Sequence, residues 1–118
     1  GKNHLRDKAI MLLLLDSSIS LQELIDLTLD DLALEKDEIY ISADGIIKKL
    51  PLKDETKLAL QSYINQERMT AHCNYLFLSQ RKGQMSIRTV QHLIKTRAEQ
   101  NPNLKGKISS TALRKLNN

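Results

Sequence analysis

The chain is poor in several residue types, and each shortage narrows what the protein can be. Its 118 residues include one cysteine, no tryptophan and only 3% aromatic residues. The lone Cys73 cannot form an internal disulfide, which is typical of a reducing cytoplasm, and we interpret it as a buried or idle thiol. With so few aromatic rings, the core must consist mainly of leucine and isoleucine. The same shortage argues against base-stacking platforms for single-stranded nucleic acid.

Patterns that bind metals or cofactors are also missing from the sequence. His4, His72 and His92 lack the spacing of zinc ligands, and one cysteine cannot complete such a site. The four glycines are isolated, so there is no phosphate-binding loop, and no G-x-S-x-G elbow occurs. We therefore expect no metal and no small-molecule cofactor. The apolar run over residues 9–15 is too short to span a bilayer and follows no signal peptide, so we expect a cytoplasmic protein without a membrane partner.

What the chain does have is a globular composition with an uneven charge. Hydrophobic residues make up 41%, which suits a single domain over residues 1–118 with its own core. The net charge is +4, but residues 1–44 carry ten acidic and four basic side chains, whereas residues 45–118 carry four acidic and fourteen basic ones. This asymmetry indicates a surface that attracts polyanions. From charge alone, nucleic-acid binding and an ordinary mixed surface are equally good interpretations.

The hydrophobic periodicity predicts a mainly α fold with a small antiparallel β-sheet, an α+β arrangement. The first helix should be central and buried because its apolar residues are nearly continuous from Ala9. Strands over 38–42 and 46–50 should form a hairpin around Asp44-Gly45, and 75–78 should add a third strand. Helices are expected over residues 5–15, 21–27, about 53–68, 86–100, and from about 110 to the end.

Several residues define the ends and faces of these helices. Ser20 followed by Glu23 is a capping-box pattern, Thr28 should cap a short turn through Asp31, and Ser86 should cap the 86–100 helix. The third helix should present its apolar side through four residues: Leu58, Leu60, Tyr63 and Ile64.

The 86–100 helix separates its apolar and basic residues onto different faces. Its apolar positions recur at spacings of three and four and should face the core: Ile87, Val90, Ile94 and Ala98. Arg88, His92 and Lys95 lie on another side, and Arg81 and Lys82 come just before the helix. Such a row of cations on a rigid element suits the phosphates of duplex DNA. A solvated basic face without a ligand is an equally good interpretation of this pattern alone.

Five segments follow one another in the order of a known family's catalytic domain. They are Leu5-Arg6-Asp7-Lys8-Ala9, the stretch 21–32, the hairpin end Lys48-Lys49-Leu50-Pro51-Leu52, the lead-in and basic helix from Phe77 to Lys95, and Leu113-Arg114. In that order the whole chain resembles the catalytic domain of the tyrosine recombinases, especially the bacterial XerD type, with its C-terminal part missing. The resemblance implies duplex DNA as a partner and a role in DNA recombination or integration.

The resemblance also implies a chemistry, for which this chain lacks most of the groups. In the family, a tyrosine attacks a phosphodiester while two arginines and a histidine stabilise the charged phosphorane, and a hairpin lysine protonates the leaving oxygen. Here Ser20 stands in the place of the first arginine, and Thr111 in the place of the histidine of the H-x-x-R box. Arg114 matches the end of that box and is the one catalytic remnant. The chain ends before a nucleophilic tyrosine.

The hairpin lysine and the tyrosines fit that chemistry no better. The position of the family's hairpin lysine falls near Ala43, although Lys48 or Lys49 could substitute for it. We interpret the tyrosines of the chain as packing residues rather than nucleophiles; they are Tyr40, Tyr63 and Tyr75. Because losing one preorganised donor costs roughly a hundred- to a thousandfold in rate, losing several leaves no credible cleavage.

Three hypotheses follow from these residues. In the leading one, a catalytically impaired domain binds duplex DNA through a ridge formed by Arg81, Lys82, Arg88, His92 and Lys95, with Lys48 and Lys49 reaching the same or a neighbouring groove and Arg114 as a phosphate clamp. In the second, a pseudo-recombinase uses its acidic half to dock onto another recombinase subunit or its own missing C-terminal segment. In the third, the chain is a piece of an active recombinase completed by residues outside it.

Overall fold

The computed structural model describes residues 4–43, 45–68 and 73–100, and it confirms a mainly helical fold with a small antiparallel sheet. Its helices are α1 (His4–Asp16), α2 (Leu21–Asp26), α3 (Asp54–Tyr63) and α4 (Ile87–Gln100). Its strands are β1 (Leu32–Ala33), β2 (Glu38–Ala43) and β3 (Ile46–Pro51). Two short 3₁₀-helical turns are η1 (Leu29–Asp31) and η2 (Leu34–Lys36). A π-helical turn, η3 (Ile64–Arg68), continues α3. The predicted helix from about residue 110 lies outside the described residues.

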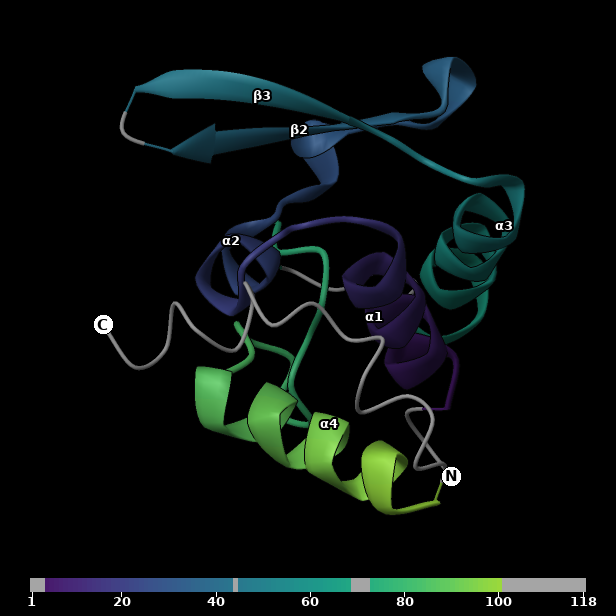
Figure 1. The fold of residues 1–118 in the computed structure, drawn as a ribbon, viewed down its shortest axis with the longest axis vertical. Helices are drawn as coiled ribbons and strands as arrows, with labels where there is room; N and C mark the ends of the chain where they lie inside the picture. Colours follow the sequence, from purple (N-terminus) through teal and green to yellow (C-terminus); the bar gives the residue numbers. More distant parts are fainter. Residues whose placement is uncertain (1–3, 44, 69–72, 101–118) are drawn as a thin grey trace.

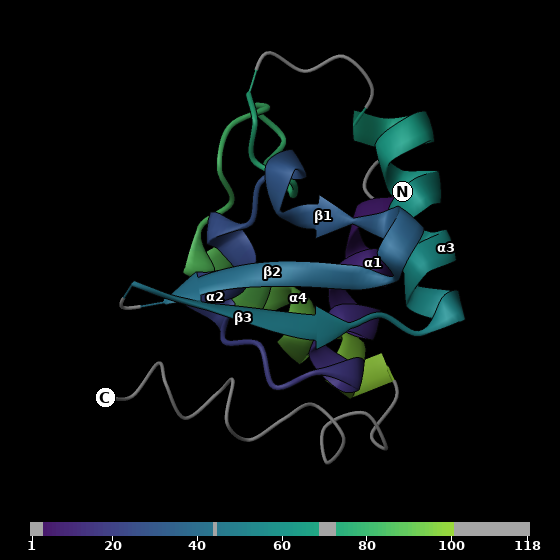
Figure 2. The same cartoon turned by 90° about the horizontal axis from the view of Figure 1, so that it is seen from above.

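Helix α1 is the central element, as its continuous apolar sequence predicts. It lies between α2 and α3, with the sheet on one side of this layer and α4 on the other (Figures 1 and 2). Ala9, Ile10 and Leu14 are fully buried, and most of the remaining core is leucine and isoleucine. Among the described residues, no helix has the length and apolarity needed to cross a membrane.

The predicted caps position the helices that follow α1. Glu23 N–H donates to Ser20 Oγ (3.1 Å), and Ser20 N–H donates to Glu23 Oε1 (2.9 Å), which completes a capping box at the start of α2. Thr28 N–H donates to Asp31 Oδ2 (2.9 Å) around η1. At the start of α4, Thr89 N–H donates to Ser86 Oγ (3.1 Å). These local bonds satisfy backbone donors that a helix leaves unpaired in its first turn.

The sheet has the order β1-β2-β3, and its third strand is not the predicted one. The hairpin prediction is confirmed, with β2 and β3 paired antiparallel and Gly45 at a φ of +76° in the connection. The segment 75–78 does not join the sheet, because β1 and β3 occupy both edges of β2. It makes only isolated bridges, from Tyr75 to Thr28 and from Leu78 to Gln84, and buries the side chains of Leu76, Phe77 and Leu78 in the core.

The predicted apolar face of α3 is wrong at one position. Leu58 is 63% exposed, whereas Thr56, Ala59, Leu60 and Tyr63 are buried. These four residues lie at i, i+3, i+4 and i+7, which places them on one side of a helix and Leu58 on the opposite side. The helical path does reach Arg68 as predicted, but its last five residues form the π-helical turn.

The two neighbouring leucines of this helix provide a test of the packing. We expect Leu60→Ala to lower the free energy of unfolding by about 2–5 kcal/mol, because Leu60 is 0% exposed and its removal leaves a cavity. Leu58→Ala is the matched control and should change stability by no more than about 0.5 kcal/mol. Urea denaturation followed by circular dichroism measures both. Equal losses in the two variants would contradict this orientation of α3.

Candidate nucleic-acid interface

Helix α4 presents a row of positive side chains opposite its buried face. Val90 and Ile94 are buried, as predicted, and Ile87 is partly buried; the side chain of Ala98 lies outside what the structure describes. Arg88, His92 and Lys95 are exposed. We call these three residues the α4 ridge. Within the described part of the chain, neither Arg88 nor Lys95 has an ion-pair partner, so both charges are available to a ligand.

A tight turn just before α4 carries two further exposed cations. Lys82 N–H donates to the Ser79 carbonyl (2.9 Å), and Ser79 N–H donates to the Gly83 carbonyl (2.9 Å). Lys82 adopts a left-handed φ of +65°, and both Arg81 and Lys82 are exposed. Arg81 lines the same hollow as Thr89 of α4, whereas Lys82 lines a different hollow together with Glu67 and Arg68. The structure therefore brings the turn and the α4 ridge to the same end of the molecule.

The hairpin lysines occupy a different place. Cross-strand partners point to the same side of a sheet, so Lys48 shares the inner face with its buried partner Ile41, and Lys49 shares the outer face with Tyr40. Lys48 Nζ lies 3.5 Å from Glu23 Oε2. The hairpin and α4 lie at opposite ends of the described fold (Figure 1). The two lysines therefore do not continue the surface of the α4 ridge, and their role in DNA binding stays a prediction.

Ser20, at the place predicted for the first arginine, serves as a helix cap. The residue is only 3% exposed, and its hydroxyl accepts a hydrogen bond from the Glu23 N–H. The Glu23 carboxylate bonds back to Ser20 N–H and pairs with Lys48. The Ser20 hydroxyl, the Glu23 carboxylate and the Lys48 ammonium therefore all have partners within the fold. Thr111 and the predicted remnant Arg114 lie outside the described residues.

Two functional features were not predicted from the sequence, and the first is Arg6. Its guanidinium is buried, with the residue only 7% exposed. Nε donates to Asp7 Oδ1 (2.9 Å), Nη2 lies 2.8 Å from the same oxygen, and Nη1 donates to the Leu78 carbonyl (3.0 Å). The contact with Leu78 spans 72 residues of sequence and could not be predicted from local patterns. The one signal in the sequence is that Arg6 and Asp7 are adjacent.

The second unpredicted feature is the π-helical turn that follows α3. The Glu67 carboxylate accepts N–H groups from Leu5 (2.7 Å) and Arg6 (2.9 Å) at the start of α1. Arg68 is buried and donates from Nε (3.0 Å) and Nη2 (2.8 Å) to the Tyr75 carbonyl, and from Nη2 to the Cys73 carbonyl. Two consecutive charged residues thereby hold α1 and the segment that leads towards α4.

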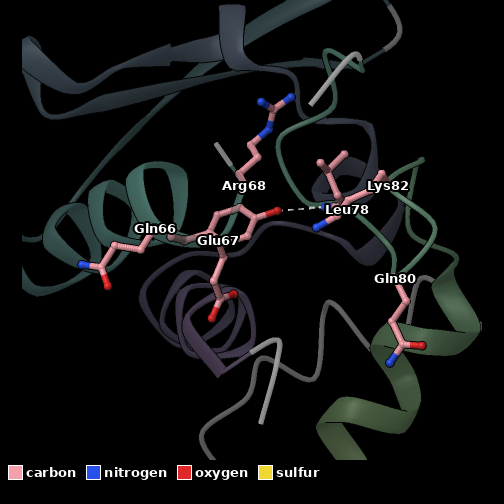
Figure 3. A pocket seen from close by; sticks show the side chains of 7 residues that line it. Gln66, Glu67, Arg68, Leu78, Gln80 and Lys82 are labelled. Atoms are coloured by element: carbon pink, nitrogen blue, oxygen red, sulfur yellow. Dashed lines mark hydrogen bonds between the residues drawn. The ribbon is translucent and has the colours of Figure 1, made fainter. Parts of the chain in front are cut away.

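This turn borders a hollow of about 550 Å³, drawn in Figure 3. Glu67, Arg68, Gln80 and Lys82 contribute to its walls, together with Tyr63. Tyr63 stacks on Phe77, with 5.6 Å between ring centroids, and its Oη accepts the Leu78 N–H (2.9 Å; Figure 3). This packing confirms the predicted role of Tyr63. Tyr40 and Tyr75 are half-buried, and so is the thiol-bearing residue Cys73.

Tyr63 gives the fold a dependence on high pH. Burial raises the pKa of its phenol above the ordinary value of 10.0, against smaller lowering effects of the Leu78 N–H and of Arg68 and Arg6. The unfolded chain therefore loses this proton first, and the free energy of unfolding falls as the pH rises above about 10 towards the raised folded pKa. Below pH 10 the contribution is fully present. We expect Tyr63→Phe to show a shallower alkaline decline, measured by urea denaturation between pH 8 and 11.

The comparison rests on slopes rather than on absolute stability. Tyr63→Phe also removes the acceptor of the Leu78 N–H, which lowers stability at every pH. Identical slopes for the two proteins above pH 10 would contradict the role of Tyr63.

Comparison with known proteins identifies relatives of this chain. A family model described as the phage integrase family matches residues 1–116. The tyrosine recombinase XerD of Haemophilus ducreyi (strain 35000HP / ATCC 700724) is 33% identical over 96 residues, which cover 77% of this chain and 32% of that protein. The chain therefore spans about a third of the length of this relative.

Solved structures share the fold. The crystal structure of XerA recombinase matches with a TM-score of 0.75 and 24% identity over 80% of this chain and 36% of its own. The Tn1549 transposon integrase, solved in complex with transposon right end DNA, matches with a TM-score of 0.62 and 21% identity over 90% of this chain and 42% of its own. Because the family model spans nearly all 118 residues, the chain belongs to the phage integrase family, as part of a tyrosine recombinase catalytic domain.

Proposed function

We propose that this chain binds duplex DNA through phosphate contacts and that its strand-cleavage chemistry is impaired. The observation that carries the proposal is the α4 ridge, in which Arg88, His92 and Lys95 are exposed on one rigid helix, with Arg81 beside the first turn of that helix. Family membership supports it, since the related Tn1549 integrase was solved with DNA.

The dimensions and chemistry of the α4 ridge suit the backbone of a duplex. From Arg88 to Lys95 the helix rises about 10 Å, at 1.5 Å per residue. Phosphates on one strand recur about every 3.4 Å along the duplex axis, so a ridge of this length spans several of them. Its sequence contains no aromatic residue, and Tyr63 and Phe77 pack on each other in the core. Stacking on unpaired bases therefore has no support here, and phosphate contact with a duplex is favoured.

The proposed loss of cleavage rests on Ser20. An arginine stabilises a phosphorane by directing several N–H donors at its oxygens. The hydroxyl of Ser20 is instead buried and accepts a bond from the backbone, and the nearby ammonium of Lys48 lies against the Glu23 carboxylate. Without the arginine, and with Lys48 paired in this way, the described residues leave little positive charge near Ser20 for a reacting phosphate.

A double charge reversal tests DNA binding by the α4 ridge. We expect the chain to bind duplex DNA with an affinity that falls steeply with salt concentration, because each neutralised phosphate releases counterions. Arg88→Glu with Lys95→Glu should weaken binding at least about tenfold and make the slope of log K against log salt shallower by about 2. Fluorescence anisotropy with a labelled duplex at 50–200 mM salt measures both quantities.

The matched control reverses two charges far from α4. Lys36→Glu with Lys53→Glu produces the same change of net charge, and both positions are exposed near the sheet and the start of α3. This variant should retain most of the affinity. Undetectable or salt-independent binding would exclude the proposal, and equal losses in the two variants would exclude α4 as the contact surface.

A nicked duplex that traps covalent intermediates tests the impaired chemistry. We expect no covalent protein–DNA adduct on denaturing gels, either with this chain or with a longer protein that contains it, because Ser20 and Thr111 remain in both. The XerD relative provides the positive control for trapping. An adduct formed by the longer protein would show that cleavage is retained and would refute this part of the proposal.

A further inference from the structure

A second group of cations lies along another side of α4, in a trough shared with the start of α1. Two adjoining hollows of about 490 and 390 Å³ have Arg6, Gln80 and Thr89 in common. Arg97 lines the first hollow from α4, and Arg81 lines the second from the preceding turn. We call this feature the Arg6–Arg97 trough. It shares His92 with the α4 ridge, but Arg88 and Lys95 do not line it.

Arg97 is a cation of the trough whose side chain has no internal partner among the described residues. It is half-buried in the wall of the trough. Throughout the ranges that the structure describes, its side chain makes neither a hydrogen bond nor an ion pair. A guanidinium carries five N–H donors. Among the described residues no buried side-chain donor lacks a partner, so the donors of Arg97 face solvent and are open to a ligand. An anion in the trough would provide partners for those donors.

Arg6 supplies a second guanidinium, at the base of the same trough. Asp7 engages its Nε and one side of Nη2, and the Leu78 carbonyl engages Nη1. This leaves one N–H on each terminal nitrogen. Asp7 is the single carboxylate among the described residues that line the two hollows, and Arg6 already matches its charge. The charges of Arg81 and Arg97 are therefore left in excess.

We propose that the Arg6–Arg97 trough binds a phosphate group. Guanidinium groups bind phosphate through paired N–H···O bonds. Here they line the trough from three separate elements, which are α1, α4 and the turn before α4. The hydroxyl of Thr96 and the amide of Gln80 add neutral donors along the same walls. The phosphate belongs either to a DNA backbone or to a free phosphomonoester, which present the same charged oxygens. The first source rests on the proposed DNA binding, and the second does not.

Amide chemical shifts of the ¹⁵N-labelled chain test the site directly. At constant ionic strength, inorganic phosphate should shift the signals of Gln80, Thr96 and Arg97 in a saturable manner. Arg97→Gln should raise the dissociation constant for phosphate at least about tenfold, and its lack of internal partners makes it compatible with folding. Lys36→Gln removes the same charge from a distant exposed site and should leave phosphate binding unchanged.

A duplex with 5′-hydroxyl ends identifies the source of the phosphate. If the duplex shifts the trough signals and inorganic phosphate competes with it, the site holds the DNA backbone. If the duplex shifts the signals of Arg88 and Lys95 but not those of Thr96 and Arg97, or binds nowhere, while inorganic phosphate still binds the trough, the site takes a free phosphomonoester. Absence of trough shifts with both ligands, or equal phosphate affinity of Arg97→Gln and the unaltered chain, would overturn the site even if the α4 ridge binds DNA.

Discussion

The arrangement of the chain depends on the carboxylate of Glu67, which accepts the backbone N–H groups of Leu5 and Arg6. An α-helix leaves its first N–H groups without internal partners, and a negative charge at that end also interacts favourably with the helix dipole. The next residue, Arg68, binds the carbonyl groups of Cys73 and Tyr75. One π-helical turn therefore sets the position of α1 and of the segment that leads to α4. The buried Arg6 and the cations near α4 depend on that placement.

The charge asymmetry of the sequence becomes a spatial division in the fold. The acidic first part of the chain supplies α2, the 3₁₀ turns and β2, whereas exposed cations gather on α4 and the turn before it. Glu23 and Asp37 each pair with a lysine from the later part of the chain, Lys48 and Lys57 respectively. These contacts occupy cations near the sheet but leave Arg88 and Lys95 free among the described residues. Arg88 and Lys95 therefore keep unpaired positive charge at the end of the fold that carries α4, whereas Lys48 and Lys57 are paired near the sheet.

Local patterns predicted the fold well, and long-range contacts account for what they missed. The caps at Ser20 and Ser86, the hairpin and the buried face of α4 depend on residues a few positions apart, which a sequence displays directly. The short strand β1 has two residues and no periodicity of its own, so its pairing with β2 could not be read from its sequence. The roles of Arg6 and Glu67 likewise arise from contacts across more than 60 residues. For the candidate site, the row of cations on α4 was predictable, whereas the trough beside it was not.

Ser20 connects this fold to the proposed loss of chemistry. The N-cap position requires a short side chain whose oxygen reaches back to the backbone two or three residues later, and the capping box with Glu23 meets that requirement. A phosphate-binding arginine has the opposite requirement, since its long side chain must carry several donors away from the helix. One side chain at this position cannot meet both requirements at once. In the proposed function, a serine at this position removes a charge from the reacting phosphate while its cap supports the start of α2, so the fold is retained where cleavage is impaired.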